Sequence, residues 1–245
     1  MKKLTLITLS LLLSASFSLP DQEAGDAVRT LLNEVKGNPK KVLSVKETTL
    51  VQKNSTSPSY KEILTLNELH YRLNTFLSEH ARNNRSLENL SNILEEKKYF
   101  ESFKYADEDS VKIFAQHALK KVEKTIEEKL KLVLDNVIRE KTTSLNKQES
   151  SLVAENASSK SSQEIKGLLL LNTLNSELQK MPPALIISSY EDKIKYLEYM
   201  QDHYHFESVK GLIKEITRKL HDVRFKGGLP YGYVSKNVTT PPKTK

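Results

Sequence analysis

The spacing of the apolar residues is the feature that most restricts the fold of this chain. Between residues 110 and 141, apolar residues recur in steps of three or four, which places them along one face of an α-helix. The stripe consists of Leu119, Val122, Ile126, Leu130, Val133 and Val137, and Leu132, Leu134 and Ile138 widen it. The spacing is coiled-coil-like, but a face of this width is typical of a helix packed inside a bundle. We therefore predict a long helix over 110–141.

Similar stripes recur along most of the chain, within residues 22–36, 59–81, 86–103, 164–178, 191–204 and 209–223. Residues 40–52 are ambiguous between a short helix and an edge strand. Glycine supplies 7 of 245 residues, far below the usual share of about 7 %, so the tight turns of a strand-rich fold are not expected. We predict an all-α fold, an irregular helical bundle of about six to seven helices. No internal repeat of fixed period is evident, so a solenoid is not predicted.

A change of composition divides the predicted helices into two halves. Nine of the 22 residues at 142–163 are Ser or Thr, which favours a surface linker between an N-terminal helical region, 19–141, and a C-terminal helical region, 164–228. The alternative is a polar continuation of the long helix. Residues 229–245 combine Pro, Gly and Lys and are predicted to form a flexible tail.

The first eighteen residues have the pattern of a secretory signal peptide. Lys2 and Lys3 precede an apolar run from residue 4 to residue 13, and Ser16 and Ser18 offer a cleavage site after Ser18. The run is short for a membrane span, although a retained anchor is the alternative. We expect secretion, to the extracellular space, the lumen of the secretory pathway or the periplasm. The chain has no Cys, so disulfides and thiolate zinc sites are excluded.

The charge balance argues against specific nucleic-acid binding. The chain has 38 Lys and Arg against 31 Asp and Glu, a net charge of +7, which falls to +5 without Lys2 and Lys3. The excess is mild and dispersed, whereas a nucleic-acid site shows a concentrated basic stripe with stacking aromatics. The helix over 209–223 is the most basic part and is amphipathic. Its apolar stripe is expected to face the bundle core, and an anionic membrane surface is the alternative.

Few side chains form a pattern that indicates chemistry. On a continuous helix, Glu198, Asp202 and His205 would share one side, which is a candidate carboxylate–histidine metal face. Asp107, Glu108 and Asp109 could be acid–base groups, but negative charge at the start of a helix already has a role against the helix dipole. No nucleophile elbow or Gly-rich phosphate loop occurs. We predict no enzyme and no cofactor, with metal-dependent activity around Asp202 and His205 as the one exception.

Five N-x-S/T sequons are candidate glycosylation sites. They begin at Asn54, Asn84, Asn89, Asn156 and Asn237. Four of them lie in expected loops, linker or tail, as glycan acceptors should. Asn89 falls inside the helix predicted over 86–103 and is the least favourable of the five.

Export, helices and the lack of catalytic groups together predict a binding protein. We expect a surface component or secreted effector whose partner is a protein or another macromolecule, with self-association as an open alternative. The second hypothesis is a carrier of an apolar small molecule, such as a lipid, in a cavity between helices. The run from Leu168 to Leu171 has more apolar surface than one helix face can bury, and the surplus would line such a cavity or a dimer seam.

Overall fold

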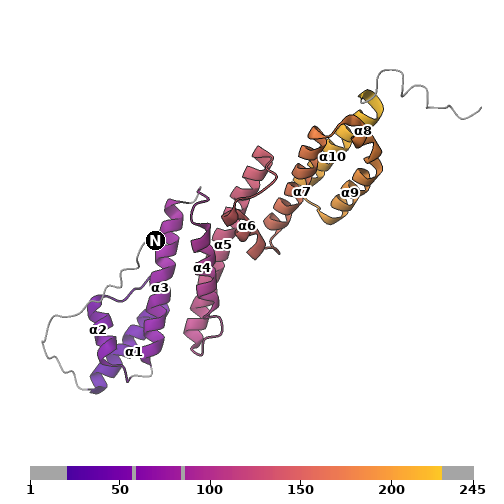
Figure 1. The fold of residues 1–245 in the computed structure, drawn as a ribbon. Coiled ribbons are helices and arrows are strands. Elements are labelled where there is room, and N and C mark those ends of the chain that lie inside the picture. The colour runs from indigo at the N-terminus through magenta and orange to yellow at the C-terminus, as the bar shows by residue number, and fades with distance from the viewer. Residues whose placement is uncertain (1–20, 57–58, 84–85, 228–245) are drawn as a thin grey trace, which may run out of the picture. The chain divides into compact units, whose positions relative to one another are not determined.

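The computed structural model describes residues 21–56, 59–83 and 86–227, and the all-α prediction is confirmed over these ranges (Figure 1). They form ten α-helices and a π-helical turn, and they include no strand. The helices are α1 (Asp21–Gly37), α2 (Val45–Lys53), α3 (Ser59–Arg82), α4 (Leu90–Glu101), α5 (Asp109–Glu140), α6 (Lys147–Glu155), α7 (Lys160–Lys180), α8 (Pro183–Ser188), α9 (Tyr190–His203) and α10 (Glu207–Asp222), followed by the π-helical turn η1 (Val223–Gly227). The predicted signal peptide, 1–18, and the predicted tail, 229–245, lie outside the described residues.

The predicted helix count and the division into halves need correction. The count of six to seven is too low, because it leaves out α2, which begins in the ambiguous segment 40–52, α6, which lies in the expected linker, 142–163, and the short α8. Asn146 precedes α6 as its N-cap residue and forms a capping box with Glu149, and Leu152 and Val153 are buried. Capping and burial thus stabilise a helix despite the Ser-rich composition. The alternative, a continuation of α5, is also wrong, since α5 ends at Glu140.

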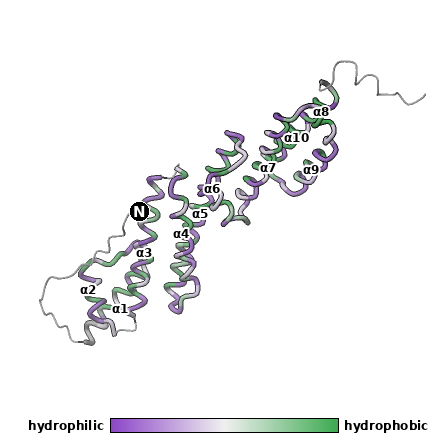
Figure 2. The backbone as a smooth tube through the Cα atoms, viewed as in Figure 1, coloured by the Kyte–Doolittle hydropathy of each residue, from purple (hydrophilic) through white to green (hydrophobic). Residues whose placement is uncertain are grey.

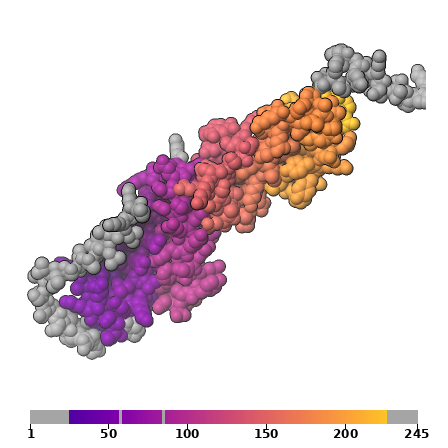
Figure 3. All heavy atoms as spheres, viewed as in Figure 1, coloured from indigo at the N-terminus to yellow at the C-terminus, as the bar shows by residue number. Residues whose placement is uncertain are grey.

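The chain divides into two packing units. The first comprises residues up to 75 together with 105–114, and the second comprises 76–104 together with 115 onward. In the first unit, α1, α2 and the beginning of α3 bury Val28, Val35, Val51, Ile63 and Leu66. In the second, α7 packs against α10, and α10 packs against α9 (Figures 1 and 3).

Contrary to expectation, the chain contains an internal repeat of about 100 residues. Residues 43–69 match residues 145–171 at a constant offset of 102, with eleven identities in 27 positions. The identical residues of the first segment are Leu43, Glu47, Leu50, Val51, Asn54, Ser57, Ser59, Glu62, Ile63, Leu66 and Leu69. The match extends into the start of α5, where Ser110-Val111-Lys112 corresponds to Ser208-Val209-Lys210 of α10 at an offset of 98. We call the two sets of matched residues the first copy and the second copy.

The two copies also agree in structure. Both α2 and α6 have nine residues, a capping box and an Asn at the C-cap, Asn54 and Asn156. The hydroxyl of Ser110 donates to Glu62, and that of Ser208 donates to Glu164. Buried positions coincide as well: Ile63, Leu66 and Leu69 correspond to Ile165, Leu168 and Leu171. The repeat escapes a search for one fixed period because the offset shortens by four residues between α3 and α5.

Hydrophilic and hydrophobic residues are interspersed along the helices (Figure 2). In the 21–227 range that the structure describes, apart from its two short gaps, no helix has the length and apolarity needed to cross a bilayer. The run from Leu168 to Leu171 splits between faces, since Leu168 and Leu171 are buried and Leu170 is 46 % exposed. A single helix therefore buries only part of the run.

Candidate binding surface

The apolar stripe of α10 faces the protein interior, as predicted. Its buried residues are Val209, Leu212, Ile213, Ile216 and Leu220. Because this stripe is covered, the opposite side of the helix is directed outward and exposes Lys214 and Arg218. Neither residue makes an ion pair with any other residue in the described part of the chain.

Aromatic side chains gather where α10 passes into η1. Tyr190, at the start of α9, is 7 % exposed, and its hydroxyl lies 3.0 Å from Nδ1 of His221. The ring of His221 stacks on Phe225, with 5.8 Å between the ring centroids. Phe225 remains 54 % exposed. A solvent-exposed aromatic side chain is thus held in place by a buried tyrosine and a histidine.

Arg224 contacts this aromatic cluster and also a neighbouring carboxylate. Its guanidinium lies 4.1 Å from the centroid of the Tyr190 ring and donates to Glu191 at 2.9 Å. The hydrogen bond to Glu191 raises the pKa of Arg224. The π-helical turn carries both Arg224 and Phe225. Short π-helical segments are frequent at functional sites.

A wide hollow of about 540 Å³ adjoins the cluster. Its lining residues are Gln201, Ile213, Lys214, Thr217, Arg218, His221, Asp222 and Phe225. Lys214 and Arg218 outnumber Asp222 among the groups charged at neutral pH, so the hollow has a positive bias. We call Lys214, Arg218, His221 and Phe225 the C-terminal basic surface. Arginine and aromatic residues are the types enriched in protein interfaces.

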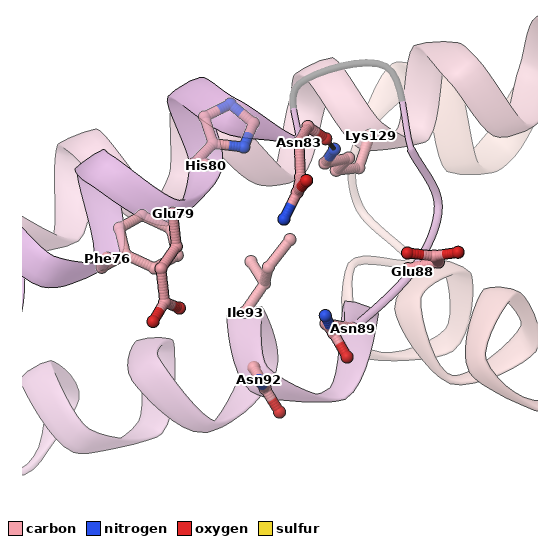
Figure 4. A pocket seen from close by; sticks show the side chains of 9 residues that line it. All are labelled: Phe76, Glu79, His80, Asn83, Glu88, Asn89, Asn92, Ile93 and Lys129. Atoms are coloured by element: carbon pink, nitrogen blue, oxygen red, sulfur yellow. Dashed lines mark hydrogen bonds between the residues drawn. The ribbon is translucent and has the colours of Figure 1, made fainter.

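A second hollow, beside the loop between α3 and α4, has a structural explanation (Figure 4). The ammonium of Lys129 is buried and donates to the backbone oxygens of Asn83, at 2.7 Å, and Ser86, at 2.6 Å. Burial lowers the pKa of Lys129. At about 50 Å³, the space is far smaller than an ordinary small-molecule site. Lys129 therefore serves to hold the loop between α3 and α4.

The proposed metal face does not form as the sequence suggested. The helix α9 ends at His203, and Tyr204 has an extended backbone, so Asp202 and His205 are not on one helix. Glu198, Asp202 and His205 are all exposed. Within the described ranges, no group of three His, Asp or Glu residues is placed to bind a metal ion. This candidate is not formed because the helix stops inside the spacing on which it relied.

The acidic residues 107–109 lie at the start of α5, where negative charge interacts favourably with the helix dipole. Asp109 begins α5 and pairs with Lys112 at 3.1 Å, and the backbone oxygen of Glu108 accepts from the Lys112 amide. Asp107, which precedes Glu108, is exposed. The polar contact that the sequence analysis missed is the neighbouring one between Ser110 and Glu62, which the second copy repeats between Ser208 and Glu164. The shared Ser-Val-Lys sequence was the signal that could have revealed it.

The sequons have different surroundings. Asn54 and Asn156 are half-buried, and each donates through Nδ2 to the backbone oxygen four residues earlier, at 2.8 Å. Asn89 is exposed and precedes α4, so its expected place inside a helix was wrong; α4 begins at Leu90. Its left-handed backbone, with φ of 59°, is one that Asn tolerates. Asn84 and Asn237 lie outside the described residues.

No protein-family model, curated protein or solved structure shows a significant match to this chain.

Proposed function

We propose that this chain is a secreted helical binding protein without a catalytic site, and that it binds an acidic segment of a macromolecular partner. The observation that supports the proposal is the C-terminal basic surface, where the exposed ring of Phe225 lies beside the exposed Lys214 and Arg218. Unpaired cations attract an acidic partner and accelerate encounter, while an anchored aromatic ring adds buried apolar area on contact.

The rigidity of the anchor supports the same proposal. Binding through a mobile side chain loses free energy when that side chain is immobilised, by about 0.5–1.5 kcal/mol for a rotamer-rich group. Phe225 stacks on His221, which bonds to the buried Tyr190. Much of this ordering is complete before the partner arrives.

Site-specific photocrosslinking tests the proposal. A photoreactive phenylalanine analogue replaces Phe225 in the full chain, and Tyr71, which is 61 % exposed, receives the same analogue as the control. A partner from the native compartment should crosslink at position 225 and not at position 71. The same crosslinks should disappear when Lys214→Glu and Arg218→Glu are added. Equal crosslinking at both positions would contradict the proposal.

The second candidate function is a carrier of an apolar small molecule. It is favoured by a hollow of about 280 Å³ between α7, α8, α10 and η1. Its lining is half apolar, from Leu178, Ile186, Leu220 and Val223, and half polar, from Asn175, Gln179, Lys219 and Asp222. This volume is near the lower end of the range for ligand sites. Displacement of a fluorescent fatty acid measures such binding, and Ile186→Trp should block it by filling the space. Failure of the native chain to bind the probe would remove the carrier function.

Export is a separate part of the proposal. Cleavage near Ser18 and glycosylation at the exposed Asn89 are expected in a eukaryotic secreting host. Intact-mass measurement of the secreted protein before and after glycosidase treatment tests both. A chain that retains residues 1–18 would contradict cleavage.

A further inference from the structure

A further hollow, of about 180 Å³, lies between α5, α7 and α10. It shares no lining residue with the C-terminal basic surface or with the hollow beside α8. Val137, Leu168 and Leu212 supply its apolar wall, and each of them is at most 9 % exposed. Asn172 supplies a polar group and is 5 % exposed.

The first copy carries two aromatic rings at the equivalent positions. His70 corresponds to Asn172 at the offset of 102, and Phe114 corresponds to Leu212 at the offset of 98. The rings of His70 and Phe114 are buried and lie 4.1 Å apart between centroids. Val35 and Leu66, the counterparts of Val137 and Leu168, are buried in the same unit. The second copy therefore keeps the apolar wall and lacks the rings.

The polar end of this site is also shared between the copies. Nδ1 of His70 lies 2.8 Å from the backbone oxygen of Lys41, and Nδ2 of Asn172 donates to the backbone oxygen of Thr142 at 2.9 Å. Asn172 uses its amide nitrogen for this bond, so its amide oxygen is available to accept from a ligand. The charged residues that line the hollow, Lys141 and Glu215, carry opposite charges and lie 3.8 Å apart, and Glu215 also pairs with Lys219 at 2.8 Å.

We propose that the hollow between α5, α7 and α10 binds a small neutral aromatic molecule that carries one hydrogen-bond donor. The ring would occupy the volume that aromatic side chains fill in the first copy, and the donor would bond to the Asn172 amide oxygen. An apolar protein cavity of about 150 Å³ accommodates benzene, so a cavity of about 180 Å³ is suited to one aromatic ring or a small bicycle. The opposite charges of Lys141 and Glu215 favour a neutral ligand over an ion.

Indole is the probe for this site. Titration of the full chain, followed by methyl NMR, should give saturable shifts at Leu168 and Leu212, with one site per chain and a Kd on the order of 1 mM, as expected for a ligand of this size. Toluene has no donor and should bind severalfold more weakly. The absence of saturable shifts at these leucines would overturn the site, and equal affinity for toluene would overturn the assigned donor.

Exchange of side chains between the copies gives the decisive variants. Asn172→His with Leu212→Phe restores the rings and should weaken indole binding at least tenfold. If that double variant fails to fold, Leu212→Phe alone tests the same point. The reverse exchange, His70→Asn with Phe114→Leu, should create a second site and raise the stoichiometry from one to two. Unchanged binding after the rings are restored would contradict the proposal.

Discussion

His70 and Asn172 lie 102 positions apart, and each bonds to a loop backbone oxygen, although the acceptor residues, Lys41 and Thr142, are 101 positions apart. The side-chain nitrogen of each is within 3 Å of a backbone oxygen in the loop before a nine-residue helix, Lys41 O for His70 and Thr142 O for Asn172. Both side chains are at least 95 % buried. The bond supplies a donor to a loop carbonyl. The repeat has thus retained a polar contact while changing the residue that makes it.

This relationship predicts a dependence of stability on pH. Burial lowers the pKa of His70 below its ordinary value of 6.5. The unfolded chain therefore binds a proton more readily than the folded chain, and stability is lost as pH falls below 6.5 toward the folded pKa. One such group contributes at most about 1.4 kcal/mol per pH unit. Urea unfolding between pH 7.5 and 5.5 should show this loss, and His70→Asn should reduce it.

The exposed His203 provides the control for that measurement. His203→Asn should leave the slope of unfolding free energy against pH nearly unchanged. An identical slope in the His70→Asn variant and the native chain would show that the buried imidazole does not titrate as described.

Lys129 is predicted to be essential for stability because it holds the loop between α3 and α4. Lys129→Met retains most of the apolar stem but leaves the backbone oxygens of Asn83 and Ser86 without their donor. Loss of these charge-assisted bonds should lower the free energy of unfolding by about 3 kcal/mol. Chemical denaturation measures the loss. Lys131→Met, at an exposed position two residues away, should change stability by less than about 0.5 kcal/mol.

We predict that position 167 must be glycine because the ring of Tyr204 packs directly against it. A Cβ at position 167 would lie 2.8 Å from Cδ1 of Tyr204, closer than packed atoms allow. Overpacking should cost about 1–3 kcal/mol of stability, which exceeds the gain of about 1 kcal/mol from the higher helix propensity of alanine. Gly167→Ala is therefore expected to lower the melting temperature. With Tyr204→Ala already present, the same change should raise it.

The matched glycine for this experiment is Gly211 in α10. A Cβ there would meet nothing within 4 Å, so Gly211→Ala should stabilise the chain by up to about 1 kcal/mol. Stabilisation by Gly167→Ala in the native background would contradict the predicted contact with Tyr204.

Glu47 is predicted to stabilise α2 above about pH 4. It accepts from Lys41 at 2.6 Å and from the Ser44 amide at 2.7 Å, and these bonds lower its pKa from 4.5 to about 2. The stabilisation is present above pH 4.5 and is lost as pH falls toward 2. At pH 7, Glu47→Gln should lower the free energy of unfolding by about 0.5–1 kcal/mol. Denaturation at pH 7 and at about pH 2 compares the chain with this stabilisation and the chain that has largely lost it.

The equivalent capping box in α6 is the control for Glu47. Thr143 stands where the first copy has Lys41, so Glu149→Gln removes a carboxylate that caps the helix without that lysine. Its effect at pH 7 should be the smaller of the two. A larger effect at Glu149 would argue against the contribution of Lys41.

The helices were predictable because their apolar residues follow the helical period, and the buried stripe Val122, Ile126, Leu130, Val133 and Val137 of α5 shows this directly. The helix α6 was missed because Ser-rich composition was given more weight than its capping residues, Asn146 and Glu149. These residues correspond to Ser44 and Glu47 at the start of α2. Comparison of the chain with itself would have revealed both helices.

The candidate surface could be predicted only in part. The basic side of α10 is visible in the sequence, because Lys214 and Arg218 lie opposite the apolar stripe. The cluster of Tyr190, His221 and Phe225 depends on packing between α9 and the end of α10, over more than 30 positions of sequence. Local patterns carry no information about such a contact, and the π-helical turn that orients Phe225 has no recognised sequence signal.

Charge reversal on the C-terminal basic surface tests directly whether this surface binds the acidic partner. The affinity of the crosslinked partner is measured for the native chain and for Lys214→Glu with Arg218→Glu. Lys120→Glu with Lys121→Glu, at exposed positions of α5, provides the same charge change elsewhere. We predict at least a tenfold loss of affinity for the first variant and little change for the second. Equal affinities for the native chain and the first variant would contradict binding through this surface.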